Sequence, residues 1–231
     1  MKFCRAVILP SVPLETSHTT VEARLLERAL RPGARVLEAG CGRTSRLAGY
    51  RNRIVELVGV DVDAEAGRVN AALDRFLAAD LCQPLPFPDS SFDLVYSNFV
   101  VEHLATPRAA FRDWRRLLRP QGALILLTSN RANPLLAAAS VLPRSVRVRV
   151  KQSGAGVAEQ DVIRTYYRAN TPRRLADLLA GAGFTPVEVS CVATLHRYAE
   201  RKPALAHAVR TAEHLFPSGL QATIVGCWRP V

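Results

Sequence analysis

The stretch Val36-Leu37-Glu38-Ala39-Gly40-Cys41-Gly42 decides the fold of this chain. It begins as a short apolar run with an acid near its end, which is typical of a buried strand, and it closes in a glycine turn. A second strand, Leu57-Val58-Gly59-Val60-Asp61, also ends in an acid. A strand, a glycine turn, a helix and a second strand with a terminal acid form the first half of a nucleotide-binding α/β unit. Asp61 then stands where a carboxylate accepts both hydroxyls of a ribose.

Strands and helices alternate along the rest of the chain. Further strands are predicted at 75–80, 92–97, 123–128, 184–192 and 220–228. Helices are predicted from about 43, and at 64–73, 108–118, 171–183 and 204–215, with a turn at 119–122. The capping box Thr19-Thr20-Val21-Glu22 predicts an earlier helix that runs to about Leu30. This alternation predicts an α/β fold with a doubly wound, Rossmann-like parallel sheet.

The same motifs resemble those of the class I S-adenosylmethionine-dependent methyltransferases. The resemblance is closest to the bacterial small-molecule group typified by the ubiquinone and menaquinone methyltransferases (type 11). It rests on Glu38, Gly40 and Gly42, on the acids Asp61 and Asp80, and on the segment 86–98, PFPDSSFDLVYSN. These motifs lie in the family's order, over roughly residues 20 to 130.

The resemblance implies a fold, a cofactor and its binding residues. The fold is a seven-stranded, mostly parallel sheet whose last strand runs antiparallel, with a lid inserted after the fifth strand. The cofactor is S-adenosylmethionine. Glu38 would take its methionine amino group, the glycine turn would lie beneath it, Asp61 would take the ribose, and Asp80 the adenine amino group, with Leu81 beside the ring. The full set of expected cofactor-binding residues is Glu38, Gly40, Cys41, Gly42, Asp61, Val62, Asp80, Leu81 and Asn98.

One position departs from the family pattern. The family usually has a third glycine where this chain has Thr44. The threonine hydroxyl and nearby backbone N–H groups can still bind a carboxylate, so the departure bears on cofactor affinity more than on cofactor identity. It also keeps open a binding protein that has lost catalysis.

Length and composition indicate a single domain. A chain of 231 residues with 48% hydrophobic content suits one α/β domain over 1–231, with an N-terminal arm at 1–17 and a substrate-side insertion at 129–168. No apolar run approaches the roughly 20 residues that span a bilayer, and no convincing cleavage site follows the start, so we expect a cytoplasmic protein. The five cysteines show no paired spacing, which favours reduced thiols over a disulfide frame or a zinc site.

The net charge of +11 raises the possibility of a nucleic-acid partner. The basic residues are nearly all arginine, a bias that also follows from genome composition. After the fourth strand the chain reads Ser97-Asn98-Phe99-Val100, without the double proline usual in enzymes that methylate exocyclic base amines. A nucleic-acid methyltransferase therefore stays an alternative and not the main prediction. A nicotinamide oxidoreductase fits less well, because Ser45 stands where its fingerprint needs a third glycine.

The sequence also offers a candidate residue for proton transfer from the acceptor. His103 is the candidate general base, because an imidazole titrates near neutral pH; the alternative is a histidine satisfied by local hydrogen bonds. Glu102-His103 also resembles catechol-type quinone O-methyltransferases, some of which complete a divalent-metal site with a second glutamate. Here Asn98 and Phe99 stand where that ligand would be, so we expect no metal.

The insertion is the candidate acceptor site. Tyr166 and Tyr167 offer flat contact surface, and Arg131, Arg164 and Arg168 are suited to an anionic group such as a carboxylate or phosphate. The alternative is that the tyrosines pack on the sheet and the arginines form a solvated face. Residues 134–150 combine leucines with arginines, which also fits peripheral contact with an anionic membrane. We expect methyl transfer to a small-molecule or lipid-like acceptor, whose identity and whose methylated atom stay open, as does the oligomeric state.

Overall fold

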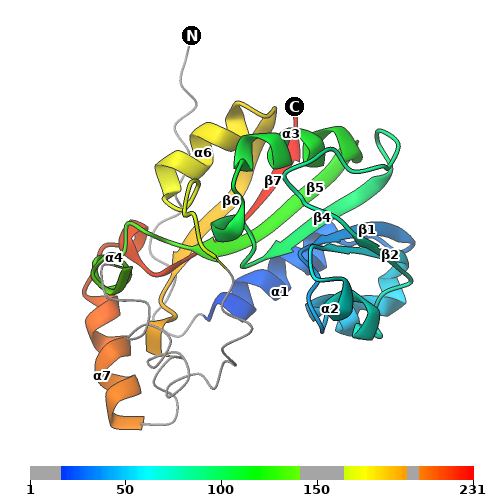
Figure 1. The fold of residues 1–231 in the computed structure, drawn as a ribbon. Coiled ribbons are helices and arrows are strands. Elements are labelled where there is room, and N and C mark those ends of the chain that lie inside the picture. The colour runs from blue at the N-terminus through cyan, green and yellow to red at the C-terminus, as the bar shows by residue number, and fades with distance from the viewer. Residues whose placement is uncertain (1–16, 141–163, 197–202) are drawn as a thin grey trace.

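The computed structural model describes residues 17–140, 164–196 and 203–231. Its centre is one seven-stranded sheet in the order β3-β2-β1-β4-β5-β7-β6 (Figure 1). The strands are β1 Ala34–Ala39, β2 Ile54–Asp61, β3 Arg75–Ala78, β4 Phe92–Asn98, β5 Leu118–Ser129, β6 Phe184–Val192 and β7 Thr223–Pro230. All neighbouring pairs are parallel except those of β7, which runs antiparallel to both β5 and β6. The predicted fold class, with its antiparallel last strand, is confirmed.

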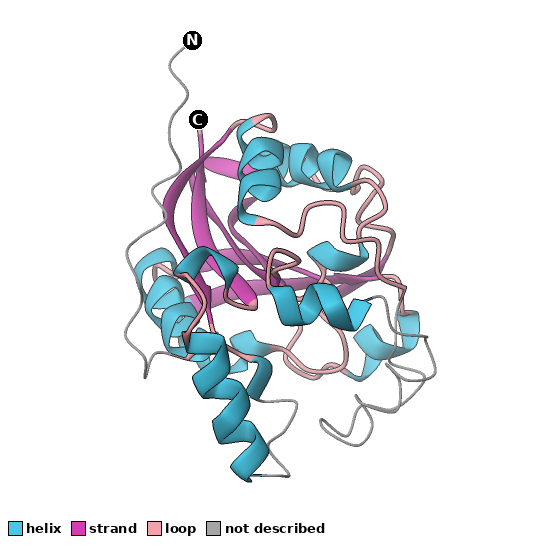
Figure 2. Ribbon diagram, turned by 90° about the vertical axis from the view of Figure 1, so that its left-hand side faces the viewer, coloured by secondary structure: helices cyan, strands magenta, loops and turns pink. Residues whose placement is uncertain are grey.

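Helices cover both faces of the sheet, as the two views of the ribbon show (Figures 1 and 2). Helices α3 and α6 lie on one face, and α1 lies on the other. The helical elements are α1 His18–Ala29, η1 Arg46–Arg53, α2 Ala64–Val69, η2 Val101–His103, α3 Pro107–Leu117, α4 Pro134–Ser140, α6 Pro172–Ala180, α7 Pro203–His214 and η5 Ser218–Leu220.

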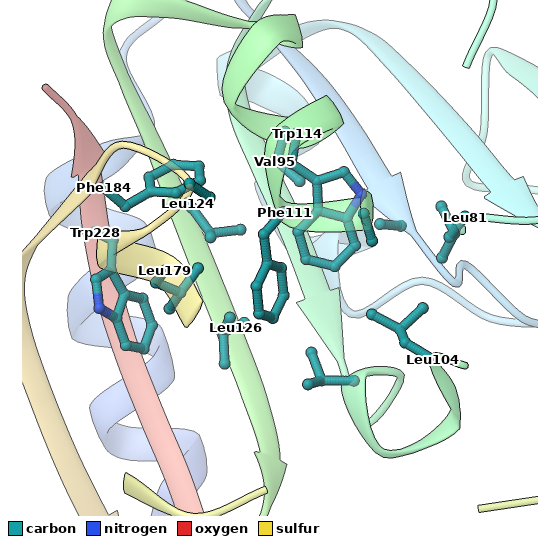
Figure 3. Close-up of a cluster of buried hydrophobic side chains, with 14 of the residues drawn as sticks. Leu81, Val95, Leu104, Phe111, Trp114, Leu124, Leu126, Leu179, Phe184 and Trp228 are labelled. Carbon is teal, nitrogen blue, oxygen red and sulfur yellow. The ribbon is translucent and has the colours of Figure 1, made fainter. Parts of the chain in front are cut away.

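The two faces of the sheet form two separate hydrophobic cores. On one face, alternate residues of the central strands such as Val95 and Leu124 pack against Phe111 and Trp114 of α3 and Leu179 of α6 (Figure 3). On the other face, a second set of strand residues packs against α1; it includes Val36, Leu94, Ile125, Leu25 and Leu26. Burial on both faces explains why the fifth strand reads as a continuous apolar run in the sequence.

Several predicted boundaries change in the structure. Helix α1 begins earlier than predicted, because Ser17 is the N-cap and its side chain accepts a hydrogen bond from the Thr20 N–H at 3.2 Å. The segment after the glycine turn is the 3₁₀ helix η1 and not an α-helix. The turn predicted at 119–122 is wrong: these residues belong to β5, whose register with β4 shifts there, so that they form an irregularity within the strand.

Parts of two predicted segments lie outside the described residues. The expected N-terminal arm is described only at Ser17, and the expected insertion only at its two ends, 129–140 and 164–168. The arginines at 144, 147 and 149, on which membrane contact partly depends, are among the residues not described. Within the part of the chain that the structure describes, no helix is long and apolar enough to cross a membrane.

The strand order places a topological switch point between β1 and β4. The chain builds outward from β1 to β2 and β3, and then returns to the other side of β1 to form β4 and β5. In such open α/β sheets, ligands bind in the crevice outside the carboxyl ends of the strands where the order reverses. A ligand-binding site is therefore expected at the carboxyl ends of β1, β2 and β4.

Gly226 in β7 offers a test of core packing. A Cβ atom at this position would lie 2.5 Å from the Trp228 ring and 3.0 Å from the Glu188 carbonyl oxygen. We expect Gly226→Ala to lower the free energy of unfolding by about 1–3 kcal/mol in urea denaturation, because overpacked cores must shift. Gly49→Ala is the matched control, because a Cβ there meets no atom within 4 Å; equal stability of the two variants would contradict this packing.

Candidate functional site

The turn after β1 requires glycine at Gly40 and Gly42 because both have a positive φ, and at Gly40 also because a side chain would not fit. Gly40 has a φ of +78°, and a Cβ atom there would lie 2.2 Å from the Val100 side chain. Gly42 has a φ of +53° but open space around it. The Gly40 N–H donates to the Val60 carbonyl at 2.7 Å, which fastens the turn to the end of β2. The turn is thus closely packed at Gly40 and open at Gly42.

Asp61 holds the same turn from the end of β2. Its Oδ2 accepts the Gly42 N–H at 2.9 Å, and its Oδ1 accepts the Asp63 N–H at 3.0 Å. The Asn70 side-chain amide donates to the carbonyls of Cys41 and Gly42, each at 3.1 Å. Asn70 is a buried residue that the sequence analysis missed, because the predicted helix 64–73 ran past it, whereas α2 ends at Val69 and Asn70 is its C-cap.

Three buried polar atoms at the ends of β1 and β4 have no hydrogen-bond partner among the described residues. They are Glu38 Oε2, Ser97 Oγ and Asn98 Oδ1. In the β1–β4 register Glu38 is opposite Tyr96, so Glu38 and Asn98, two residues further on, belong to the same sheet face. Buried acceptors without donors are costly and rare in native proteins. A ligand ammonium or amide that donates to them fits this pair of oxygens.

Burial dominates the electrostatics of Glu38. The side chain is almost fully buried, and this desolvation raises the pKa of Glu38 to about 7. A hydrogen bond from Ser45 lowers that pKa, while the negative charge of Glu22 raises it. The carboxyl is therefore ready to ionise near neutral pH and gains most from a cationic partner.

An ion pair between the exposed Arg46 and the buried Glu22 supports the segment that follows the turn. Arg46 of η1 donates to Glu22 of α1 through Nε at 2.8 Å and Nη2 at 2.6 Å, and the Tyr96 hydroxyl donates to the same carboxylate. Glu22 is buried, and it joins α1, η1 and β4. Because its guanidinium is engaged in this way, Arg46 acts as a structural support for the turn.

The remaining expected cofactor residues lie along the same edge of the sheet. Val62 follows Asp61 and is 64% exposed, so its side chain is open to contact. Asp80 is exposed two residues beyond β3, and its Oδ1 accepts the Cys82 N–H at 2.8 Å. Leu81 is buried in the core beside Leu104 (Figure 3). The expected cofactor-binding residues thus lie at or shortly after the carboxyl ends of β1, β2, β3 and β4, with Leu81 packed into the core.

The turn η2 after β4 anchors the far end of the insertion. Glu102 is buried, and its carboxylate accepts the Thr128 hydroxyl at 2.7 Å and the Ser129 hydroxyl at 2.8 Å. Its carbonyl oxygen accepts the N–H groups of Tyr166 at 2.8 Å and Tyr167 at 3.1 Å. Sequence reasoning considered Glu102 only as a metal ligand; in the structure it joins β5 to the segment 164–168.

His103 contacts the same segment. Its Nδ1 lies 2.7 Å from the Arg164 carbonyl oxygen. Because a carbonyl oxygen only accepts, this contact assigns the N–H to Nδ1 and leaves the Nε2 lone pair free in the neutral ring. The ring is therefore held by a local hydrogen bond, and the role of His103 as a general base stays a prediction.

Each predicted acceptor arginine lies over one of two tyrosines that are adjacent in sequence. We call these residues the Arg–Tyr cluster: Arg131, Arg164, Tyr166, Tyr167 and Arg168. The Arg131 guanidinium carbon lies 4.8 Å from the centre of the Tyr167 ring. Those of Arg164 and Arg168 lie 4.9 Å and 5.6 Å from the centre of the Tyr166 ring. These are cation–π distances, so the tyrosines serve as platforms for the arginines.

No group of three or more His, Cys, Asp or Glu side chains suited to a metal ion occurs within residues 17–140, 164–196 and 203–231. Cys41, Cys82, Cys191 and Cys227 are free thiols. Burial raises the pKa of Cys41 to about 12, with the charges of Asp61 and Glu38 adding to the effect, so its thiol stays protonated at neutral pH.

Comparison with known proteins identifies the central region. A family model described as a methyltransferase domain matches residues 37–126, which run from β1 into β5. The chain is 33% identical over 118 residues to a malonyl-[acyl-carrier protein] O-methyltransferase of Enterobacter lignolyticus, over 49% of this chain and 46% of the relative. It is 30% identical over 162 residues to a ubiquinone biosynthesis O-methyltransferase of Ruegeria pomeroyi, over 68% of this chain and 62% of the relative. The match thus spans about half the length of the first of these relatives and somewhat more of the second.

Solved structures agree on the fold. An S-adenosylmethionine-dependent methyltransferase from Mesorhizobium loti superimposes with a TM-score of 0.63 at 18% identity, covering 94% of this chain and 99% of the other. At this identity the comparison concerns the arrangement of the sheet and its helices.

Glu38 gives a stability test that needs no ligand. Because its folded-state pKa of about 7 lies above the ordinary 4.5, the folded state binds more protons between these values, and the free energy of unfolding falls as pH rises through that window. We expect Glu38→Gln to be more stable than the native chain above about pH 7, by up to about 3 kcal/mol, and nearly equal to it at about pH 4.5. Urea titrations across this range check it, with exposed Glu65→Gln as the control. A pH-independent difference would contradict the raised pKa.

Proposed function

We propose that this chain, which belongs to the class I S-adenosylmethionine-dependent methyltransferase family, transfers the methyl group of S-adenosylmethionine to a small-molecule or lipid-like acceptor. The observation that carries the proposal is Glu38: a buried carboxyl with an unpartnered oxygen, at the end of β1 and next to a glycine turn. The relatives act on different acceptors by name, so the acceptor does not carry over from them.

The residues at the sheet edge fit the donor group by group. Glu38 Oε2 and Asn98 Oδ1 are buried acceptors without donors, which suits the methionine ammonium. The open space at Gly42 suits close approach of the ligand, and Arg43 and Thr44 are exposed beside it. Each Asp61 oxygen uses one lone pair on a backbone N–H, and a carboxylate oxygen can accept a second hydrogen bond, here from a ribose hydroxyl. Asp80 and Leu81 would contact the adenine.

The donor supplies a methyl group already activated by a sulfonium. The protein therefore needs mainly to align an acceptor atom about 3 Å from the methyl carbon and to exclude water. A general base contributes only where the acceptor must lose a proton as it attacks. In this chain that role falls to His103 Nε2, because Nδ1 is occupied by the Arg164 carbonyl.

Donor binding tests the cofactor assignment. We expect isothermal titration to detect S-adenosylmethionine and not NADH, with at least about tenfold weaker binding in Asp61→Asn, since a lost charged hydrogen bond costs roughly 1.5–3 kcal/mol. Exposed Glu65→Gln is the matched control. Absence of S-adenosylmethionine binding in the correctly folded native chain would overturn the proposal.

The pH dependence of donor binding tests Glu38 itself. With a pKa of about 7, Glu38 must lose a proton to bind an ammonium, so affinity falls as the pH drops below that value. We expect about tenfold weaker binding at about pH 6 than at about pH 7.5, and little change above. In Glu38→Gln, binding should be weak at both values of pH. A flat profile in the native chain would assign the ammonium to another residue.

Turnover tests His103. If the acceptor must lose a proton, His103→Gln should lower kcat by about 10²–10⁴-fold while donor affinity stays unchanged. A glutamine at this position can still donate a hydrogen bond to the Arg164 carbonyl. A native melting temperature of the variant is the control for correct folding. Unchanged turnover in a folded variant would remove His103 from catalysis, whereas donor binding without turnover in the native chain on any acceptor would favour a binding protein.

A further inference from the structure

We infer that the Arg–Tyr cluster is a preformed subsite for an anionic group of the acceptor, a carboxylate or a phosphate. This inference rests on the proposed function, because it names the chemical class of the acceptor. The alternative to anion binding given in the sequence analysis is that the tyrosines pack on the sheet and the arginines form a solvated face. The geometry of the cluster favours binding.

The first argument is charge. One guanidinium lies 4.8 Å from the centre of the Tyr167 ring, and two lie 4.9 and 5.6 Å from the centre of the Tyr166 ring, so two tyrosines adjacent in sequence carry three positive charges. The ion pairs recorded among the described residues all use other arginines. The buried carboxylate next to the cluster, Glu102, accepts two hydroxyl hydrogen bonds and forms no ion pair there. Among residues 17–140, 164–196 and 203–231 no carboxylate pairs with these three charges, and such a group of like charges produces a local field that an anion would neutralise.

The second argument is preorganisation. The cluster combines two segments that are far apart in sequence, and both attach to the same buried polar network. The Arg131 N–H donates to the Asn170 carbonyl at 2.6 Å. The Asn170 side chain in turn donates to the Thr128 hydroxyl at 2.6 Å, and that hydroxyl donates to Glu102. Binding sites need such rigid support to hold a charged group at low entropic cost.

The 164–168 segment is attached to η2 mainly by hydrogen bonds of its backbone, so most donors of its arginine side chains are not needed to hold it in place. The N–H groups of Tyr166 and Tyr167 donate to the Glu102 carbonyl, and Tyr167 keeps a φ of +53°, a left-handed conformation that is unusual for a tyrosine. The Arg168 Nη1 donates to the Ala105 carbonyl at 2.7 Å. That contact uses one of its five N–H donors and leaves the others for a ligand.

The third argument is location. The turn η2 touches the glycine turn at its beginning and the Arg–Tyr cluster at its end. Val100, the residue before η2, contacts the space above Gly40, and His103, its last residue, binds the Arg164 carbonyl. The three-residue turn η2 is thus the connection between the glycine turn and the segment that carries Arg164 and Arg168. An anion held by these arginines would orient the acceptor with its charged end away from the methyl group.

Small amphiphilic probes test the inference directly. Binding of hexyl phosphate, hexanoate and neutral hexanol is measured by titration calorimetry, together with inorganic phosphate, which shows whether the alkyl chain contributes. The native chain is expected to bind at least one of the two anionic amphiphiles about tenfold or more tightly than hexanol. Arg131→Gln/Arg168→Gln is expected to reduce that preference about tenfold, since each charge-assisted hydrogen bond contributes appreciably.

The control variant is Arg112→Gln/Arg173→Gln. These arginines are exposed on α3 and α6, and the change in net charge is the same. The control should keep the native preference for the anionic probe. Equal preference in the native chain and in the cluster variant would overturn the inference, and so would an equal loss in both variants, because that result indicates a general effect of net charge.

Donor titration separates this inference from the proposed function. Both double variants should bind S-adenosylmethionine with native affinity and melt at the native temperature, since neither pair touches the glycine turn. If the native chain fails to bind the donor but keeps its preference for the anionic probe, the proposed function fails and the subsite stands. If the donor binds and the anionic preference is absent, only the anionic acceptor is excluded.

Discussion

The burial of β1 on both faces is the constraint on which the rest of the structure depends. With a hydrophobic core on each side and a strand at each edge, β1 has no exposed surface except at its ends. Polar side chains are then confined to the point where the strand stops, and the parallel neighbours stop at the same edge. The glycine turn, Asp61 of β2 and the oxygens of β1 and β4 that have no partner among the described residues lie there as a consequence of sheet packing.

The same constraint makes Glu38 costly. A carboxylate attracts a cationic ligand more strongly when it is shielded from water. The same burial raises the pKa of Glu38 to about 7. The negative charge of Glu22, which pairs with Arg46, raises that pKa further. The site therefore resembles other functional sites in which local stability is reduced in favour of ligand binding.

The sequence predicted what depends on periodicity and local motifs. The strand positions, and Glu38, Asp61, Asp80 and Asn98 at or beyond the strand ends, follow from these patterns, whereas the antiparallel last strand was implied by the family resemblance. It did not predict the contacts that tertiary packing alone creates. Asn70 on the turn carbonyls and Glu102 on the 164–168 segment join residues far apart in the chain, and an isolated asparagine or glutamate carries no sign of its partner. The extra residues of β5 at 119–122 looked like a turn because proline and glycine usually end strands, whereas here the strand continues around an irregularity.

The way the 164–168 segment is attached has a consequence for how such a site changes over evolutionary time. Its fastenings to the sheet are mostly main-chain atoms: the Glu102 carbonyl, the N–H groups of Tyr166 and Tyr167, and the Arg164 carbonyl. Main-chain contacts survive most substitutions, so residues on the segment can be exchanged without detaching it. If the segment lines the acceptor site as proposed, its side chains can change over evolution while the residues at the ends of β1, β2 and β4 stay the same. A library of variants confined to residues 164–168 would then sample acceptor preference with the rest of the fold unchanged.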